Sequence, residues 1–158
     1  MIGYTHNDLI LLGFRHLNRD SFLIGSEFGT KTERPDIFAY SRKRKTTVVE
    51  VKISRADFQA DLRKPHRHQP GGLGNFRFYL APFGLLDPDE LPDGWGLMAV
   101  KRGRVYRIKE SKEFESNTGD EMWLIAKMLM MSNPSEGRLG PSQKISIHFH
   151  EKVYEGAS

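Results

Sequence analysis

The stretch that decides the fold is TTVVEVKI, residues 46–53. It is rich in β-branched residues, which favour strands, and side chains alternate between the two faces of a strand. We therefore expect Glu50 and Lys52 on one face and Val49 and Val51 on the other. Burying a glutamate beside a lysine is costly unless the two are paired or bound to something. The pattern predicts a central strand with a functional charged pair, against the alternative of a surface strand whose charged pair is solvated.

Further helices and strands are predicted on both sides of this strand. Helices are expected at 5–17, 54–63 and 119–131, and strands at 22–28, 36–40, 76–81, 97–100, 105–109 and 143–150. This order predicts an α+β, or mixed α/β, fold with a central mixed sheet flanked by helices. We expect a single domain over residues 1–158, with a core over about 5–81. A β-hairpin, a helix and a strand are appended over about 82–158.

Composition narrows the class of protein. The chain has 158 residues, of which 38% are hydrophobic and 28% charged, as in a soluble globular domain. Lys and Arg outnumber Asp and Glu by 24 to 20, and this basic balance favours a polyanionic partner such as nucleic acid. There are no cysteines, which excludes disulfides and thiolate metal sites. No apolar run suits a membrane helix or a signal peptide, so a cytoplasmic protein without membrane contact is expected.

Acidic residues near the central strand predict a metal site. Asp36 begins the preceding strand, and antiparallel pairing can bring it close to Glu50. Two such carboxylates, with the backbone carbonyl of Val51, suit Mg²⁺ or Mn²⁺. Lys52 beside the metal could orient a water or stabilise charge on a phosphate. Glu27 is a candidate third acid, although it could equally be an exposed strand residue.

The order and spacing of these residues resemble a known family. Pro35-Asp36, thirteen intervening residues and then Glu50-Val51-Lys52 are similar to the signature of PD-(D/E)XK nucleases. The stretch from Val49 to Phe58 further resembles a bacterial branch that includes the MmcB-like DNA repair proteins. The resemblance covers roughly residues 5–81 and implies a restriction-endonuclease-like core. It also implies that Asp36 and Glu50 hold the metal and that Lys52 serves catalysis. Many members have an extra acid on the first helix, where Asp8 is the candidate here, unless it only caps that helix.

Two basic clusters are candidates for contact with a nucleic-acid backbone. The first comprises Arg42, Lys43 and Arg44, and the second comprises Arg63, Lys64 and Arg67. A solvated loop is the alternative for each cluster.

The sequence therefore predicts a Mg²⁺- or Mn²⁺-dependent nuclease that acts on DNA in preference to RNA. The alternatives are a nucleic-acid-binding accessory protein of the same fold with little or no cleavage, and an unrelated α+β domain with a chance match. Whether the chain forms a homodimer stays open.

Overall fold

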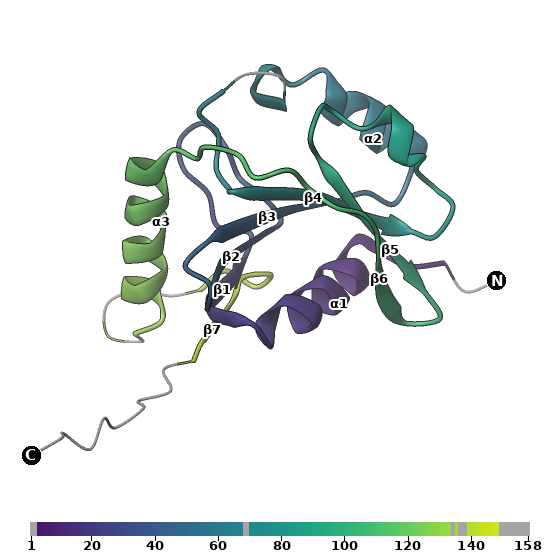
Figure 1. Cartoon of the computed structure of the whole chain (residues 1–158). Coiled ribbons are helices and arrows are strands. Elements are labelled where there is room, and N and C mark those ends of the chain that lie inside the picture. Colours follow the sequence, from purple (N-terminus) through teal and green to yellow (C-terminus); the bar gives the residue numbers. More distant parts are fainter. Residues whose placement is uncertain (1–2, 68–69, 134, 136–138, 149–158) are drawn as a thin grey trace, which may run out of the picture.

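Strand β3 (Thr46–Val51) lies at the middle of a seven-stranded sheet in the computed structural model, which describes residues 3–67, 70–133, 135 and 139–148 (Figure 1). The other strands are β1 (Ser21–Ser26), β2 (Ile37–Ser41), β4 (Phe76–Pro82), β5 (Gly96–Lys101), β6 (Arg104–Lys109) and β7 (Lys144–Ile147). They are arranged in the order β6-β5-β4-β3-β2-β1-β7. Strands β3, β4 and β5 run parallel to one another, whereas all other neighbours are antiparallel. The predicted mixed sheet is confirmed.

Helix α1 (His6–Asn18) covers one face of the sheet. Thr5 and Asp8 form a reciprocal capping box at its start, so the capping interpretation of Asp8 is confirmed. Gly13 allows the close approach of this helix, because a Cβ atom there would lie 2.7 Å from a Leu80 methyl group. Val49 and Val51 face this helix within an apolar cluster.

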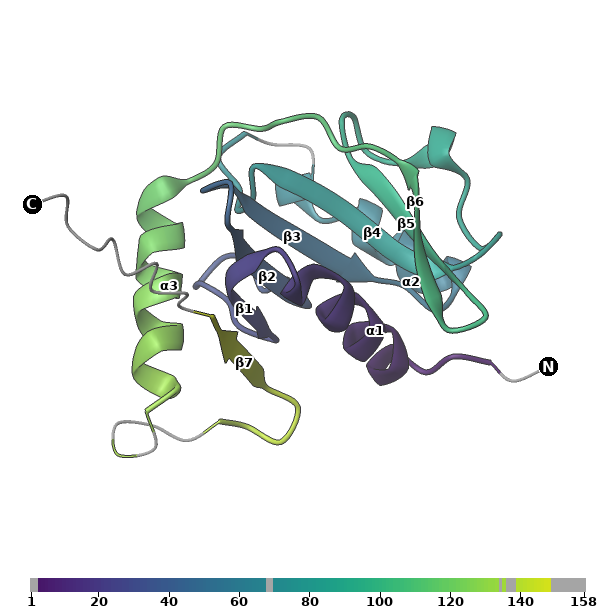
Figure 2. The ribbon, with the colours of Figure 1, turned by 60° about the horizontal axis from the view of Figure 1, so that its bottom comes forward.

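Helices α2 (Arg55–Leu62) and α3 (Thr118–Met131) cover the other face, as Figures 1 and 2 show. Leu124 and Met128 of α3 pack on β1, β2 and β3, and Phe58 of α2 packs on β4 and β5. Two short 3-10 helices, η1 (Pro65–Arg67) and η2 (Pro88–Glu90), lie in the connections after α2 and β4. The apolar contacts of α3 and those of α2 form two separate clusters. Between these clusters the sheet carries buried charged residues.

The elements expected as appendages extend the same sheet at both edges. Strand β5 pairs in parallel with β4, and β7 pairs with β1. Asn117 caps α3, because its side chain accepts a hydrogen bond from the Asp120 backbone N–H. Residues 149 and 150 of the predicted last strand lie outside the described residues. None of the described helices combines the length and the apolar character needed to cross a membrane.

Candidate active site

Glu50 and Lys52 lie side by side near the end of β3, on the face that α2 and α3 cover. Glu50 is 4% exposed and Lys52 is 8% exposed. The Lys52 Nζ atom lies 3.9 Å from Glu50 Oε2. The expected alternation of side chains is therefore confirmed, and the alternative of a solvated surface pair is wrong.

Asp36 lies directly before β2, opposite Glu50. The register pairs Ile37 with Val49, so continuing it by one residue places Asp36 across from Glu50. Strand β2 starts only at Ile37, so the next hydrogen bond to β3 is made by the side chain of Asp36. Its Oδ2 atom accepts a 2.8 Å hydrogen bond from the Val51 backbone N–H. The structure thus brings the expected pair of carboxylates to one end of the two strands.

Glu27 lies beside Asp36, together with a histidine that the sequence reasoning missed. The backbone N–H of Glu27 donates to the Asp36 carbonyl at 2.9 Å. His6, Glu27 and Asp36 each offer one ligand atom, and these atoms lie within 4.8 Å of one another. The His6 Nε2 atom is 3.5 Å from Asp36 Oδ1. All three residues are partly accessible to solvent. The group does not include Glu50.

A buried network of charges surrounds Glu50 and Lys52. Asp61 of α2, 1% exposed, accepts hydrogen bonds from Arg67 at 2.7 and 3.0 Å and from the Tyr79 hydroxyl at 2.6 Å. Lys52 Nζ is 3.3 Å from the same carboxylate. Arg67 continues the network, since its NH2 atom lies 2.9 Å from Glu50 Oε1. Sequence reasoning missed Asp61 and Tyr79. Lys64 Nζ also lies 3.2 Å from the Asp61 carboxylate.

The position of Arg67 corrects the expectation that it belongs to an exposed basic cluster. Its side chain is 5% exposed, and its guanidinium pairs with Asp61 and Glu50 while lying over the Trp95 ring. A buried cation with these partners is not part of an exposed basic cluster. Arg63 and Lys64 of the same cluster remain exposed.

Burial sets the ionisation of these groups. It raises the pKa of Glu50 to about 7, and the negative charges of Asp36 and Asp61 add to that effect, while Arg67 and Lys52 oppose it. Burial also disfavours the charge of Asp61, but the hydrogen bonds from Arg67 and Tyr79 outweigh this and hold its pKa below the usual range. Asp61 therefore stays ionised at neutral pH, whereas Glu50 is poised between its two forms.

The other basic cluster lies at the far end of the strands. Arg42, Lys43 and Arg44 are exposed in the turn between β2 and β3. Asp36 and Glu50 lie at the opposite ends of these strands, so the turn is roughly 16 Å away at about 3.3 Å per residue. Lys64, by contrast, reaches the charge network itself through Asp61.

The fold is known from a solved structure. No family model matches this chain, and no curated protein sequence matches it. The fold is similar to that of the SPO1766 protein of unknown function from Silicibacter pomeroyi, with a TM-score of 0.61 and 20% sequence identity. The match covers 87% of this chain and 98% of that chain. This likeness concerns the fold alone.

Proposed function

We propose that the protein is a metal-dependent nuclease of the PD-(D/E)XK type, which hydrolyses phosphodiester bonds in DNA. The observation that carries the proposal is the convergence of Asp36, Glu50 and Lys52 at one end of two paired strands. A net charge of +4 supports a polyanionic substrate. The restriction-endonuclease-like core belongs to the same proposal and rests on the order of helices and strands over residues 6–82.

The residues around Asp36 fit a hard divalent cation. Glu50 is a buried carboxylate with a pKa near 7, next to a second carboxylate, and a bound cation would favour its ionised form. Asp36, Glu50 and the carbonyl of Val51 would hold Mg²⁺ or Mn²⁺, with His6 and Glu27 close enough to Asp36 to contribute. When bound, the ion supplies Lewis-acid activation of the phosphate and of water.

Lys52 is the residue placed to stabilise negative charge on the phosphate. Asp61 holds its ammonium group at 3.3 Å, and Asp61 is itself fixed by Arg67 and Tyr79. The lysine is therefore positioned before any substrate arrives. Donors that are fixed in advance near developing charge are the most effective in catalysis.

One contact favours a second function, that of a nucleic-acid-binding accessory module with little cleavage. Arg67 lies 2.9 Å from Glu50 Oε1 and neutralises the same carboxylate that a metal would need. A nuclease requires Glu50 to exchange this partner for the cation. If Arg67 held Glu50 permanently, the charge network would only stabilise the fold.

The experiment that separates these functions is a cleavage assay on a panel of nucleic acids. The purified protein is incubated with Mg²⁺ or Mn²⁺ and with single- and double-stranded DNA and RNA, and EDTA serves as the control. The nuclease proposal predicts metal-dependent cleavage of DNA. Binding without cleavage by any metal would favour the accessory module, and neither binding nor cleavage would refute both.

A further inference from the structure

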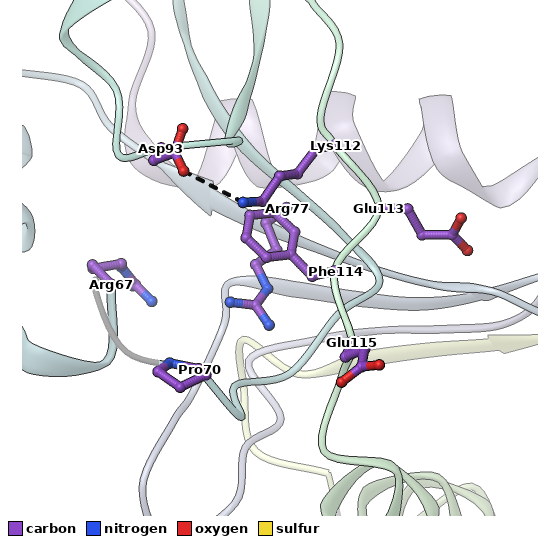
Figure 3. Close-up of a pocket in the computed structure, with 8 residues that line it drawn as sticks. All are labelled: Arg67, Pro70, Arg77, Asp93, Lys112, Glu113, Phe114 and Glu115. Atoms are coloured by element: carbon purple, nitrogen blue, oxygen red, sulfur yellow. Dashed lines mark hydrogen bonds and ion pairs between the residues drawn. The ribbon is translucent and has the colours of Figure 1, made fainter.

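Arg67, which contacts Glu50 in the candidate active site, also lines a pocket of about 420 Å³ (Figure 3). Three basic side chains from separate parts of the chain line it: Arg67 of η1, Arg77 of β4, and Lys112 in the segment after β6. Pro70 and Phe114 supply apolar walls. Its volume is within the range of small-molecule sites, about 300–1,000 Å³.

Arg67 brings an unsatisfied donor to this pocket. Its side chain is 5% exposed, and its Nε and NH2 atoms are engaged by Asp61 and Glu50. The NH1 atom is buried and has no hydrogen-bond partner among the residues that the structure describes. The Oε1 atom of Glu33, 3.7 Å away, is too far for a hydrogen bond. Buried donors are nearly always satisfied, so this nitrogen indicates a missing partner that accepts hydrogen bonds.

Arg77 presents a second buried cation. It is 3% exposed, and its Nε and NH2 atoms donate to the carbonyls of Gly74 and Gly72 at 3.0 and 3.3 Å. Its guanidinium lies 4.1 Å from the centre of the Phe114 ring, and Figure 3 shows Arg67 directed toward it. Burial lowers the pKa of Arg77, and this outweighs the opposite effect of the nearby Glu33 and Glu121 carboxylates.

The acidic residues that line the pocket are exposed, whereas Glu33, the buried ion partner of Arg67 at 3.7 Å, is not part of the lining. Asp93 is almost fully exposed and pairs with Lys112 at 3.4 Å. Glu113 is exposed and pairs with Lys45, and Glu115 is also exposed. Water screens charges at such positions, whereas the two arginines are in the interior. The buried side chains that line the pocket are therefore both cationic, although the lining as a whole contains as many acids as bases.

We propose that this pocket binds a phosphate monoester, carried either by the end of a nucleic-acid strand or by a free nucleotide. Guanidinium groups recognise phosphate oxygens through paired hydrogen bonds. Lys112 would add a third positive charge at the mouth, and Pro70 and Phe114 would contact the attached nucleoside. The strand-end source rests on the proposed nuclease function; the free-nucleotide source does not.

Arg67 would couple this pocket to the candidate active site. One nitrogen of its guanidinium is against Glu50, and the same residue lines the pocket. A phosphate in the pocket would draw the guanidinium toward itself and weaken its hold on Glu50. Occupancy of the pocket would thus release Glu50 for a metal ion.

The test is a binding measurement in EDTA, where no cleavage occurs. Fluorescently labelled single-stranded DNA with a terminal phosphate is compared with the same strand ending in hydroxyl groups, and AMP and inorganic phosphate are used as competitors. We expect the phosphorylated strand to bind at least tenfold more tightly and inorganic phosphate to compete. Lys112→Ser should reduce this preference several-fold, whereas Lys101→Ser, an exposed lysine on the β5–β6 hairpin, should leave it unchanged. Both positions are at the surface, so the fold is preserved.

The competitors identify the source of the phosphate. AMP that binds as tightly as the phosphorylated strand supports a free nucleotide, and a strand that binds at least tenfold more tightly than AMP supports a strand end. Equal affinity for both strand ends, without competition by AMP or inorganic phosphate, would overturn the proposal. Selective phosphate binding by a protein that never cleaves would refute the proposed nuclease function but not the proposed pocket. Cleavage without such selectivity would refute the proposed pocket but not the nuclease function.

Discussion

Replacing Glu50 by glutamine should change how protein stability depends on pH. In the folded protein the pKa of Glu50 is raised from 4.5 to about 7, mainly because the side chain is buried. Between these two values the folded state holds a proton that the unfolded state has lost. Wild-type stability therefore falls as pH rises through this window. At about 1.4 kcal/mol per pKa unit, the shift amounts to about 3 kcal/mol.

The variant has no carboxyl group at this position and lacks this dependence. Relative to wild type, Glu50→Gln should gain up to about 3 kcal/mol in free energy of unfolding between pH 4.5 and pH 8. Burial also raises the pKa of Glu33, but this contribution is common to both proteins and cancels in the difference. Asp61 remains to pair with Arg67 in the variant.

The assay is urea unfolding of both proteins at several pH values, followed by circular dichroism. Glu110→Gln, which removes a carboxylate from an exposed position after β6, is the matched control for the loss of one charge. A free-energy difference between wild type and Glu50→Gln that stays the same from pH 4.5 to pH 8 would refute the reasoning. Added Mg²⁺ should stabilise wild type at pH 8 more than it stabilises the variant, because only wild type keeps both carboxylates of the proposed site.

Three other predictions follow from the site and its surroundings. Lys52→Met should lower the cleavage rate by about 100-fold or more, as loss of an oxyanion-stabilising donor does, with metal affinity measured by calorimetry little changed. His6→Ala should weaken Mn²⁺ binding by roughly tenfold in the same titration, and an unchanged affinity would remove His6 from the site. Changing Arg63 and Lys64 to serine should flatten the slope of log K for DNA binding against log salt by about 0.7–0.9 for each phosphate that the protein no longer neutralises. A slope that changes only when Arg42–Arg44 are neutralised would place the phosphate-binding residues on the distant turn instead.

Local patterns in the sequence predicted the strands and helices well. The β-branched run around Val49 indicated a central strand, and its alternation placed Glu50 and Lys52 on one face. The capping pair of Thr5 and Asp8 marked the start of the first helix. These features depend on neighbours in the chain, and their physical causes are visible in the sequence itself.

Contacts between distant segments could not be predicted in the same way. His6 reaches Asp36 only because α1 crosses the sheet with its first turn at the start of β2. Arg67 is another example, since its basic neighbours indicated a solvated surface. It turns inward because Asp61 and Glu50 are buried carboxylates that require a cation nearby. The pocket beside Arg67 likewise combines residues from four separate segments, which no local pattern relates.

The most direct test of the proposed function compares DNA cleavage by wild type and by Asp36→Asn in the presence of Mg²⁺ or Mn²⁺. Asparagine retains the oxygen that accepts the hydrogen bond from the Val51 backbone but removes the negative charge, so the fold should persist. We predict metal-dependent cleavage by wild type and none by Asp36→Asn, with the same circular dichroism spectrum for both proteins. Equal cleavage by the two proteins, or none by wild type with any metal and substrate, would contradict the assignment of Asp36, Glu50 and Lys52 as a nuclease site.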